Sequence, residues 1–145
     1  MMKIISIRKI YILLLLTIVF SSCKKEEIDI EKPVISNLKI GENNEAILYK
    51  SEVIYLEFDA SDNSELANYK ISISKSAKGD PASETGWEFS KIYNIPSGKT
   101  TYKVINQQIT VPTDALSANY NFTITLYDRS GNYFAYTTVV PLISE

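Results

Sequence analysis

The chain of 145 residues contains no histidine and a single cysteine, which limits the chemistry it can perform. Catalysis by a Ser-His or Cys-His pair needs a histidine base, histidine-ligated metals need the imidazole, and an internal disulfide needs two cysteines. All three are therefore excluded. The side chains that remain for chemistry are carboxylates, amides and tyrosines.

Acidic and amide side chains gather in two segments that have the character of loops. Asp59, Asp62 and Asn63 close one apolar segment, and Asp128 and Asn132 flank a tight turn near the end of the chain. Oxygen ligands of this kind suit Ca²⁺, so these residues are candidates for a calcium site if the two loops meet. The alternative is that they form turn hydrogen bonds to their own backbones.

Two tyrosines offer a different candidate site. If the turn at 128–132 joins two strands, Tyr127 and Tyr133 oppose each other on the outer face, while Leu126 opposes Phe134 on the core face. Exposed tyrosines can stack on a sugar or contact a partner protein. The alternative is an ordinary cross-strand pair. Paired carboxylates also suggest glycoside hydrolysis, but a small domain rarely provides the necessary cleft, so we expect no enzymatic activity.

Strand periodicity dominates the chain from residue 32 onward. Short runs of alternating β-branched and aromatic residues are separated by Gly, Pro, Asn and Ser, and no long helix is indicated. The expected strands are 33–40, 53–60, 66–74, 87–95, 101–111, 120–126 and 133–140, with 46–49 as an extension or a short separate strand. Residues 113–116 suggest one capped helical turn. About seven strands in a domain at residues 32–145 predict an immunoglobulin-like antiparallel β-sandwich. Its two candidate loops then lie at one end.

The first 22 residues are interpreted as a lipoprotein signal peptide. Three basic residues precede an apolar run at 10–20 that is too short to span a bilayer. Two serines then lead to Cys23, the position at which a lipoprotein signal peptidase would cut before a lipid-modified cysteine. We therefore expect the chain to be anchored to a membrane by lipid on Cys23. An ordinary secretory leader with a free thiol is the alternative.

A charged segment follows the cysteine. Residues 23–31 are too polar to form a core and are expected to be a tether. The residues directly behind Cys23 resemble the export signal that sends Bacteroidetes lipoproteins to the outer face of the outer membrane; they are Lys24, Lys25, Glu26 and Glu27. Surface exposure is the prediction, and the periplasmic leaflet is the alternative. Without the leader, the chain has 12 basic and 17 acidic residues and is therefore net negative, so no nucleic-acid partner is expected.

Six short motifs in order along residues 32–142 resemble a family of Bacteroidetes lipoprotein domains of unknown function. They are Lys32-Pro33-Val34-Ile35, Asp59-Ala60-Ser61-Asp62-Asn63, Leu66-Ala67-Asn68-Tyr69-Lys70-Ile71, Trp87-Glu88-Phe89-Ser90-Lys91, Ile109-Thr110-Val111-Pro112 and Asp128-Arg129-Ser130-Gly131-Asn132. The resemblance implies an immunoglobulin-like fold and an envelope location. The expected function is a non-catalytic binding or accessory module for a protein or glycan. A divalent-cation-binding domain is the alternative.

Overall fold

The computed structural model describes residues 28–76 and 86–144, and within these it is built from β-strands. The signal peptide, Cys23 and the export signal lie outside the described residues, as does most of the polar loop after residue 75. The strands are β1 (Val34–Ile40), β2 (Leu48–Tyr49), β3 (Val53–Ser61), β4 (Leu66–Lys75), β5 (Phe89–Asn94), β6 (Thr101–Thr110), β7 (Asn119–Asp128) and β8 (Tyr133–Ile143). Each falls on a segment that alternation predicted.

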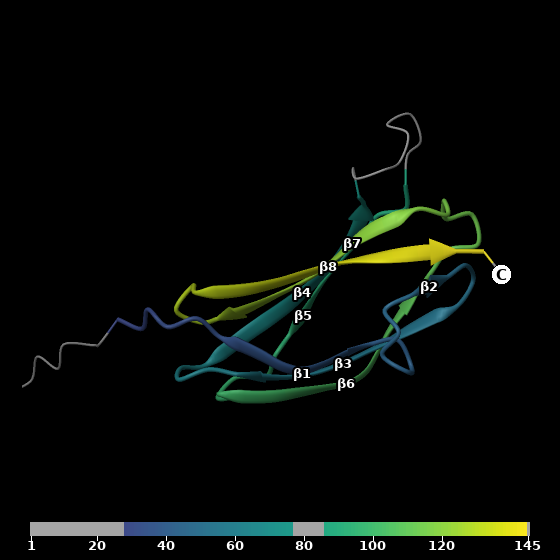
Figure 1. Ribbon diagram of the computed structural model, residues 1–145. Coiled ribbons are helices and arrows are strands. Elements are labelled where there is room, and N and C mark those ends of the chain that lie inside the picture. Colours follow the sequence, from purple (N-terminus) through teal and green to yellow (C-terminus); the bar gives the residue numbers. More distant parts are fainter. Residues whose placement is uncertain (1–27, 77–85, 145) are drawn as a thin grey trace, which may run out of the picture.

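Two sheets form a β-sandwich (Figure 1). One has three strands in the order β1-β3-β6, and the other has five in the order β2-β8-β7-β4-β5. All neighbours are antiparallel except the two-residue β2, which runs parallel to the end of β8. The segment 46–49 thus supplies a short separate strand. No helix long enough and apolar enough to cross a bilayer occurs in the part of the chain that is described.

Alternation along each strand decides which side chains enter the space between the sheets. In β3, Ile54, Leu56 and Phe58 are buried, while the side chains between them face outward. The same period of two buries Phe122 and Ile124 in β7, and both have no exposed surface. The core is therefore made of the apolar faces that the sequence pattern predicted.

A buried tyrosine closes the corner before β7. Tyr120 has no exposed surface, and its hydroxyl donates a 2.9 Å hydrogen bond to the carbonyl of Leu116 and accepts one of 3.2 Å from the backbone N–H of Trp87. Upstream, a single turn is closed by the N–H of Ala115 and the carbonyl of Pro112. The structure thus has one hydrogen-bonded turn where a single capped helical turn was expected, and the turn is not extended into a helix.

The hairpin of β7 and β8 has the predicted register, but not the predicted burial. Leu126 pairs with Phe134 and Ile124 with Tyr136, as expected. Phe134 and Tyr136 nevertheless remain 38% and 37% exposed. The three-stranded sheet has fewer strands than the sheet it covers, and the first half of β8 lies at that wider edge. Facing the core side is therefore not sufficient for burial there.

Candidate metal centre

Three carboxylates meet at one end of the sandwich. Asp29, Asp62 and Asp128 each offer an oxygen, and these atoms lie within 4.8 Å of one another. Asp29 precedes β1, Asp62 follows β3, and Asp128 is the last residue of β7. In Figure 1 the segment leading into β1 enters at the end where the hairpin between β7 and β8 turns, and the C-terminus lies at the opposite end.

Strand register explains why three distant segments converge. Val34, the first residue of β1, pairs with Ser61, the last residue of β3, so the residues before β1 lie beside those after β3. Leu66 at the start of β4 pairs with Asp128, which brings the connection between β3 and β4 to the end of β7. Antiparallel pairing thus delivers three chain segments to one place.

The last hairpin holds Asp128 in place. Its Oδ1 accepts a hydrogen bond of 2.7 Å from the backbone N–H of Asn132, and its Oδ2 accepts one of 2.7 Å from the side-chain amide of the same residue. Gly131 supplies the positive φ of 96° that the turn requires. Asp128 is only 3% exposed, so its orientation is set by the turn.

Asp29 is bound to both neighbouring loops. Its Oδ1 accepts a hydrogen bond of 3.1 Å from the side-chain amide of Asn63 and one of 3.0 Å from the N–H of Glu31. The amide of Asn132, which already binds Asp128, also donates to the backbone carbonyl of Asp29 at 3.2 Å. The two amides therefore align the carboxylates while leaving part of each free.

Two oxygens of the cluster have no hydrogen-bond donor of ordinary geometry. Asp29 Oδ2 and Asp62 Oδ2 are shielded from solvent, and neither accepts a hydrogen bond of ordinary geometry from a described residue. Weaker interactions with the hydroxyls of Ser130 and Ser64 still help to lower the pKa of Asp29, and those with the backbone N–H groups of Asn63 and Ser64 help to lower the pKa of Asp62. A carboxylate oxygen that loses water and gains no donor is unfavourable unless a positive charge compensates it. The unpaired oxygens are the feature that turn hydrogen bonding does not explain.

The electrostatics of the cluster differ from one carboxylate to the next. Burial raises the pKa of the Asp62 carboxyl above its ordinary value, and repulsion from Asp128 and Asp29 raises it further. The hydrogen bond from Asn63, followed by that from the N–H of Glu31, lowers the pKa of Asp29. Asp29 is thus readily ionised, whereas burial and repulsion from the other two carboxylates disfavour the ionised form of Asp62.

The basic side chain that follows Asp128 in the sequence forms an ion pair and a hydrogen bond with residues outside the cluster. Arg129 follows Asp128, but its Nε binds the carboxylate of Glu65 and its Nη2 donates to the hydroxyl of Ser97 at 2.9 Å. Glu65 also accepts a 2.7 Å hydrogen bond from the N–H of Gly98. None of the ion pairs within the described residues includes a carboxylate of the cluster.

The donor set fits a hard cation. Ca²⁺ takes six to eight oxygen ligands at about 2.3 to 2.6 Å, so ligands on opposite sides of one ion lie roughly 5 Å apart. The observed spacing of up to 4.8 Å lies within that limit. A hollow of about 450 Å³ beside the cluster is lined by residues 28–31 together with Asn63 and Ser64, which gives access from solvent.

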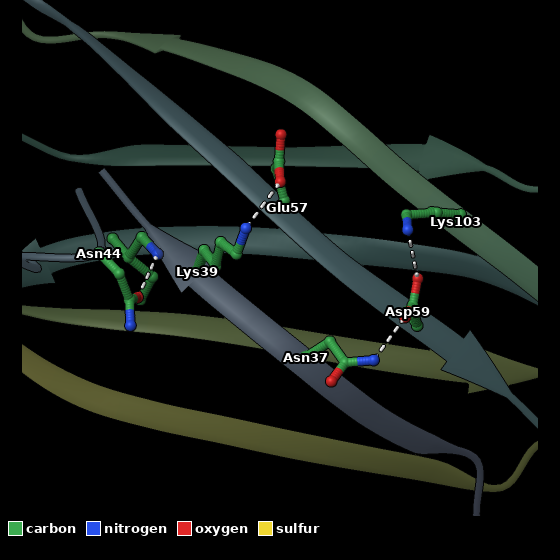
Figure 2. Close-up of polar contacts among 7 residues, drawn as sticks. Asn37, Lys39, Asn44, Glu57, Asp59 and Lys103 are labelled. Atoms are coloured by element: carbon green, nitrogen blue, oxygen red, sulfur yellow. Dashed lines mark hydrogen bonds and ion pairs between the residues drawn. The ribbon is translucent and has the colours of Figure 1, made fainter. Parts of the chain in front are cut away.

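Most of the residues predicted for a metal site are brought together. Asp62, Asn63, Asp128 and Asn132 all contribute to the cluster. Asp59 does not contribute. It lies on the outer face of the three-stranded sheet (Figure 2). Its carboxylate is 3.7 Å from the Nζ of Lys103 and accepts a 2.7 Å hydrogen bond from the side-chain amide of Asn37.

The physical reason for the error at Asp59 is its place within β3. Phe58 and Ala60 on either side are buried, so alternation turns Asp59 outward. It joins a surface row of paired charges that also includes Lys39 and Glu57, 3.7 Å apart (Figure 2). Asp62 lies beyond the end of the strand and is free of that alternation.

Asp29 was missed because its segment was interpreted as tether. The one available signal is the alternation Ile28-Asp29-Ile30-Glu31, which continues toward the first strand. Combined with antiparallel pairing of the first and third strands, that pattern would have placed Asp29 beside the loop of Asp62. The high charge of residues 23–31 led to their interpretation as a tether, so Asp29 was not considered as a ligand.

The tyrosine pair lies apart from this cluster. Tyr127 and Tyr133 oppose each other on the outer face of the five-stranded sheet, with ring centroids 5.8 Å apart and ring planes at 38°. Tyr133 is 55% exposed. The pairing is as predicted, and a contact role stays a prediction.

Fold and site together define a small β-sandwich domain with an acidic cluster of oxygen ligands at one end. The chain belongs to the family DUF4625, a domain of unknown function, whose family model matches residues 21–142. That match includes Asp29 and the segment expected to be tether. No curated protein matches the chain.

Two solved structures show a distant likeness. A catalytically inactive OgpA from Akkermansia muciniphila, in complex with an O-glycopeptide, is 13% identical with a TM-score of 0.45, over 83% of this chain and 32% of that one. The sporulation control protein Spo0M from Bacillus subtilis is 9% identical with a TM-score of 0.46, over 80% of this chain and 51% of that one. The chain therefore spans about a third and about half of these two proteins.

Proposed function

We propose that this chain is a non-catalytic, lipid-anchored module of the outer membrane that binds a divalent cation through Asp29, Asp62 and Asp128. The observation that carries the cation site is the pair of shielded carboxylate oxygens without a donor of ordinary geometry, Asp29 Oδ2 and Asp62 Oδ2. One bound ion would pair with both and would cancel the repulsion among the three carboxylates.

Calcium is the cation that this donor set favours. The chain has no histidine, and the cluster offers carboxylate oxygens from three separate segments, a kind of ligand that Ca²⁺ takes with flexible geometry. Mg²⁺ demands near-octahedral geometry at shorter distances and keeps more of its water. The remaining positions around Ca²⁺ would be filled by water from the adjoining hollow.

Isothermal titration calorimetry tests the site directly. The chain from residue 23 onward, with Cys23→Ser to remove the lipid, is titrated with CaCl₂ and separately with MgCl₂. We expect one Ca²⁺ per chain with a dissociation constant on the order of 10⁻⁴ M, typical of extracellular modules. Asp62→Asn should abolish the heat of binding.

Asp59→Asn is the matched control for that titration. It removes the same charge three residues away, at a carboxylate that is bound to Lys103 on the outer face. It should leave the calcium affinity unchanged. Equal loss in both variants would mean that general charge, and not a built site, attracts the ion.

The lipid anchor is proposed from the position of Cys23 after an apolar run and two serines. Metabolic labelling with a fatty-acid analogue should mark the wild-type chain and not Cys23→Ala. Label that persists on the variant would exclude acylation at this residue.

Surface export is proposed from the charged residues behind the cysteine. Replacing Lys25, Glu26 and Glu27 by Ala should lower the protease accessibility of the domain on intact cells. The melting temperature should stay unchanged, because these residues precede the sandwich. Equal protease shaving of variant and wild type would contradict an export signal.

A contact surface for a protein or glycan is the second candidate function. The observation in its favour is the exposed pair of Tyr127 and Tyr133, whose aromatic faces are the kind that anchor partners. Tyr133→Ala should lose retention on a glycan panel or an envelope extract at unchanged melting temperature. Equal retention of wild type and variant would remove this candidate.

A further inference from the structure

The edge of the five-stranded sheet is open along most of β8. β2 is the outermost strand of that sheet, but it pairs only with Leu142 and Ile143. Among the described residues, no backbone hydrogen bond joins residues 133–141 to another segment on the side away from β7. Most of β8 is therefore an edge strand.

The ladder with β7 determines which backbone groups of β8 face the open side. Antiparallel neighbours alternate between residue pairs that exchange both N–H···O bonds and pairs that exchange none. The N–H of Leu142 donates to the carbonyl of Ala118 at 2.8 Å, and the register runs unbroken back to Tyr133, so the even-numbered residues of β8 bond to β7. The odd-numbered residues from Tyr133 to Val139 present their N–H and C=O groups to the open side.

This stretch lacks the features by which proteins protect a sheet edge. Charged side chains, β-bulges and short strands discourage pairing with a further strand. β1 has Lys39 and a bulge, β5 has only six residues and includes Lys91, and β6 has Lys103. Residues 133–140, all of them described, include no charged residue, no proline and no break in register. This edge is thus open to pairing.

Apolar side chains remain uncovered on both faces of the same stretch. Phe134 and Tyr136 point to the core side and are 38% and 37% exposed, and Tyr133 and Val139 on the outer face are 55% and 51% exposed. Aromatic residues are enriched among the anchors of protein interfaces. A further strand at this edge would cover these side chains and would pair the open backbone groups.

We propose that this further strand is the β8 of a second copy of the chain, paired antiparallel about a two-fold axis at Tyr136. Tyr133 then lies opposite Val139 of the second copy, and Ala135 lies opposite its Thr137. Each odd-numbered residue from 133 to 139 exchanges both bonds with an odd-numbered residue of the other copy, which gives about eight hydrogen bonds. Protein interfaces typically carry about 5 to 15. The two five-stranded sheets become one continuous sheet.

Charge and symmetry favour a second copy as the occupant. The chain without its leader is net negative, so two copies repel each other where charged surfaces meet. The open stretch of β8 brings no charged side chain into a contact with itself, whereas β1, β5 and β6 would each bring a lysine. A two-fold contact needs one self-complementary surface, and the register at Tyr136 pairs every open group from 133 to 139.

Sedimentation velocity on the chain from residue 23 with Cys23→Ser measures this association. We expect the dimer fraction to rise with protein concentration between about 1 µM and 1 mM. Tyr136→Lys sets two like charges opposite each other on the axis and should weaken the dimer about tenfold or more. Ile92→Lys is the matched control. It places the same charge on β5, at the other edge of the sheet, where Ile92 is 59% exposed, and should leave dimerisation unchanged.

Two further measurements test the register and do not depend on Tyr136→Lys alone. Because residue 136 lies opposite itself, Tyr136→Lys and Tyr136→Glu should each be largely monomeric, and their equimolar mixture should form a heterodimer. Tyr136→Cys carries a single thiol and should oxidise to a disulfide-linked dimer, since strand pairs of this kind place the Cα atoms about 4.5 Å apart, within the range of a disulfide. Ile92→Cys should cross-link much more slowly under the same oxidant.

The outcomes separate this contact from others. A dimer that Tyr136→Lys weakens and that the Lys and Glu mixture restores supports the proposal. A chain that stays monomeric up to about 1 mM overturns it. A dimer that persists in Tyr136→Lys, or that Ile92→Lys weakens instead, also overturns it, because the contact then lies elsewhere. The association goes beyond the proposed cation site and does not depend on it, so calorimetry with calcium decides that site separately.

Discussion

Asp62→Asn should have opposite effects on stability with and without calcium. The substitution preserves the size of the side chain and removes one of three neighbouring charges. In EDTA this relieves the repulsion that helps to raise the pKa of Asp62, so the free energy of unfolding should increase. In calcium it removes a ligand, so the stabilisation by the ion should be lost.

The sizes of the two effects differ enough to be separated. Relief of surface-charge repulsion typically adds about 0.5 to 2 kcal/mol, and the partial exposure of Asp62 favours the lower end. For a dissociation constant near 10⁻⁴ M, 10 mM calcium is about a hundredfold excess and stabilises the wild type by about 2.7 kcal/mol. At about 4 °C per kcal/mol, the wild-type melting temperature should rise by roughly 11 °C.

Thermal melting at pH 7 in EDTA and in 10 mM CaCl₂ measures both effects. Asp62→Asn should melt above the wild type in EDTA and well below it in calcium. Asp59→Asn should keep the full calcium response, because its partner is Lys103 on another face. The reasoning is refuted if Asp62→Asn melts lower than the wild type in EDTA and still gains the full calcium shift.

Three further predictions concern packing, the corner and pH. Phe122→Ala should lower the free energy of unfolding by about 3 to 5 kcal/mol in urea titrations, because the side chain is fully buried, whereas Tyr133→Ala on the outer face should lower it by no more than about 1 kcal/mol. Similar losses in both would contradict the observed faces. Tyr120→Phe removes the hydroxyl between Leu116 and Trp87 and should lower the free energy of unfolding by about 1 to 3 kcal/mol in the same titration; an unchanged value would show that the corner does not depend on it. Because the pKa of Asp62 is raised in the folded state, the contribution of this carboxyl to stability is present below its ordinary pKa of 3.8 and is lost as pH rises through the raised pKa. The difference in stability between wild type and Asp62→Asn in EDTA should therefore close on acidification. Calcium affinity should fall at the same time, because protons compete with the ion for the carboxylates. A gap that widens at low pH would reverse this assignment.

The sequence by itself determined the strands and their faces. Alternation with a period of two is local, so the buried side of β3 and β7 and the pairing of Tyr127 with Tyr133 follow from residue order and one tight turn. Four of the five residues that the sequence proposed for a metal site lie in the observed cluster, because carboxylates and amides at strand ends can be recognised in the sequence.

Only the tertiary structure decided which of these residues meet. Asp29 joins the cluster because β1 pairs antiparallel with β3, with Val34 opposite Ser61, and no local pattern encodes that pairing. Asp59 is excluded because its strand turns it toward Lys103. Phe134 stays partly exposed because the three-stranded sheet has fewer strands than the five-stranded sheet it covers. Each outcome depends on contacts between distant segments, which local periodicity cannot specify.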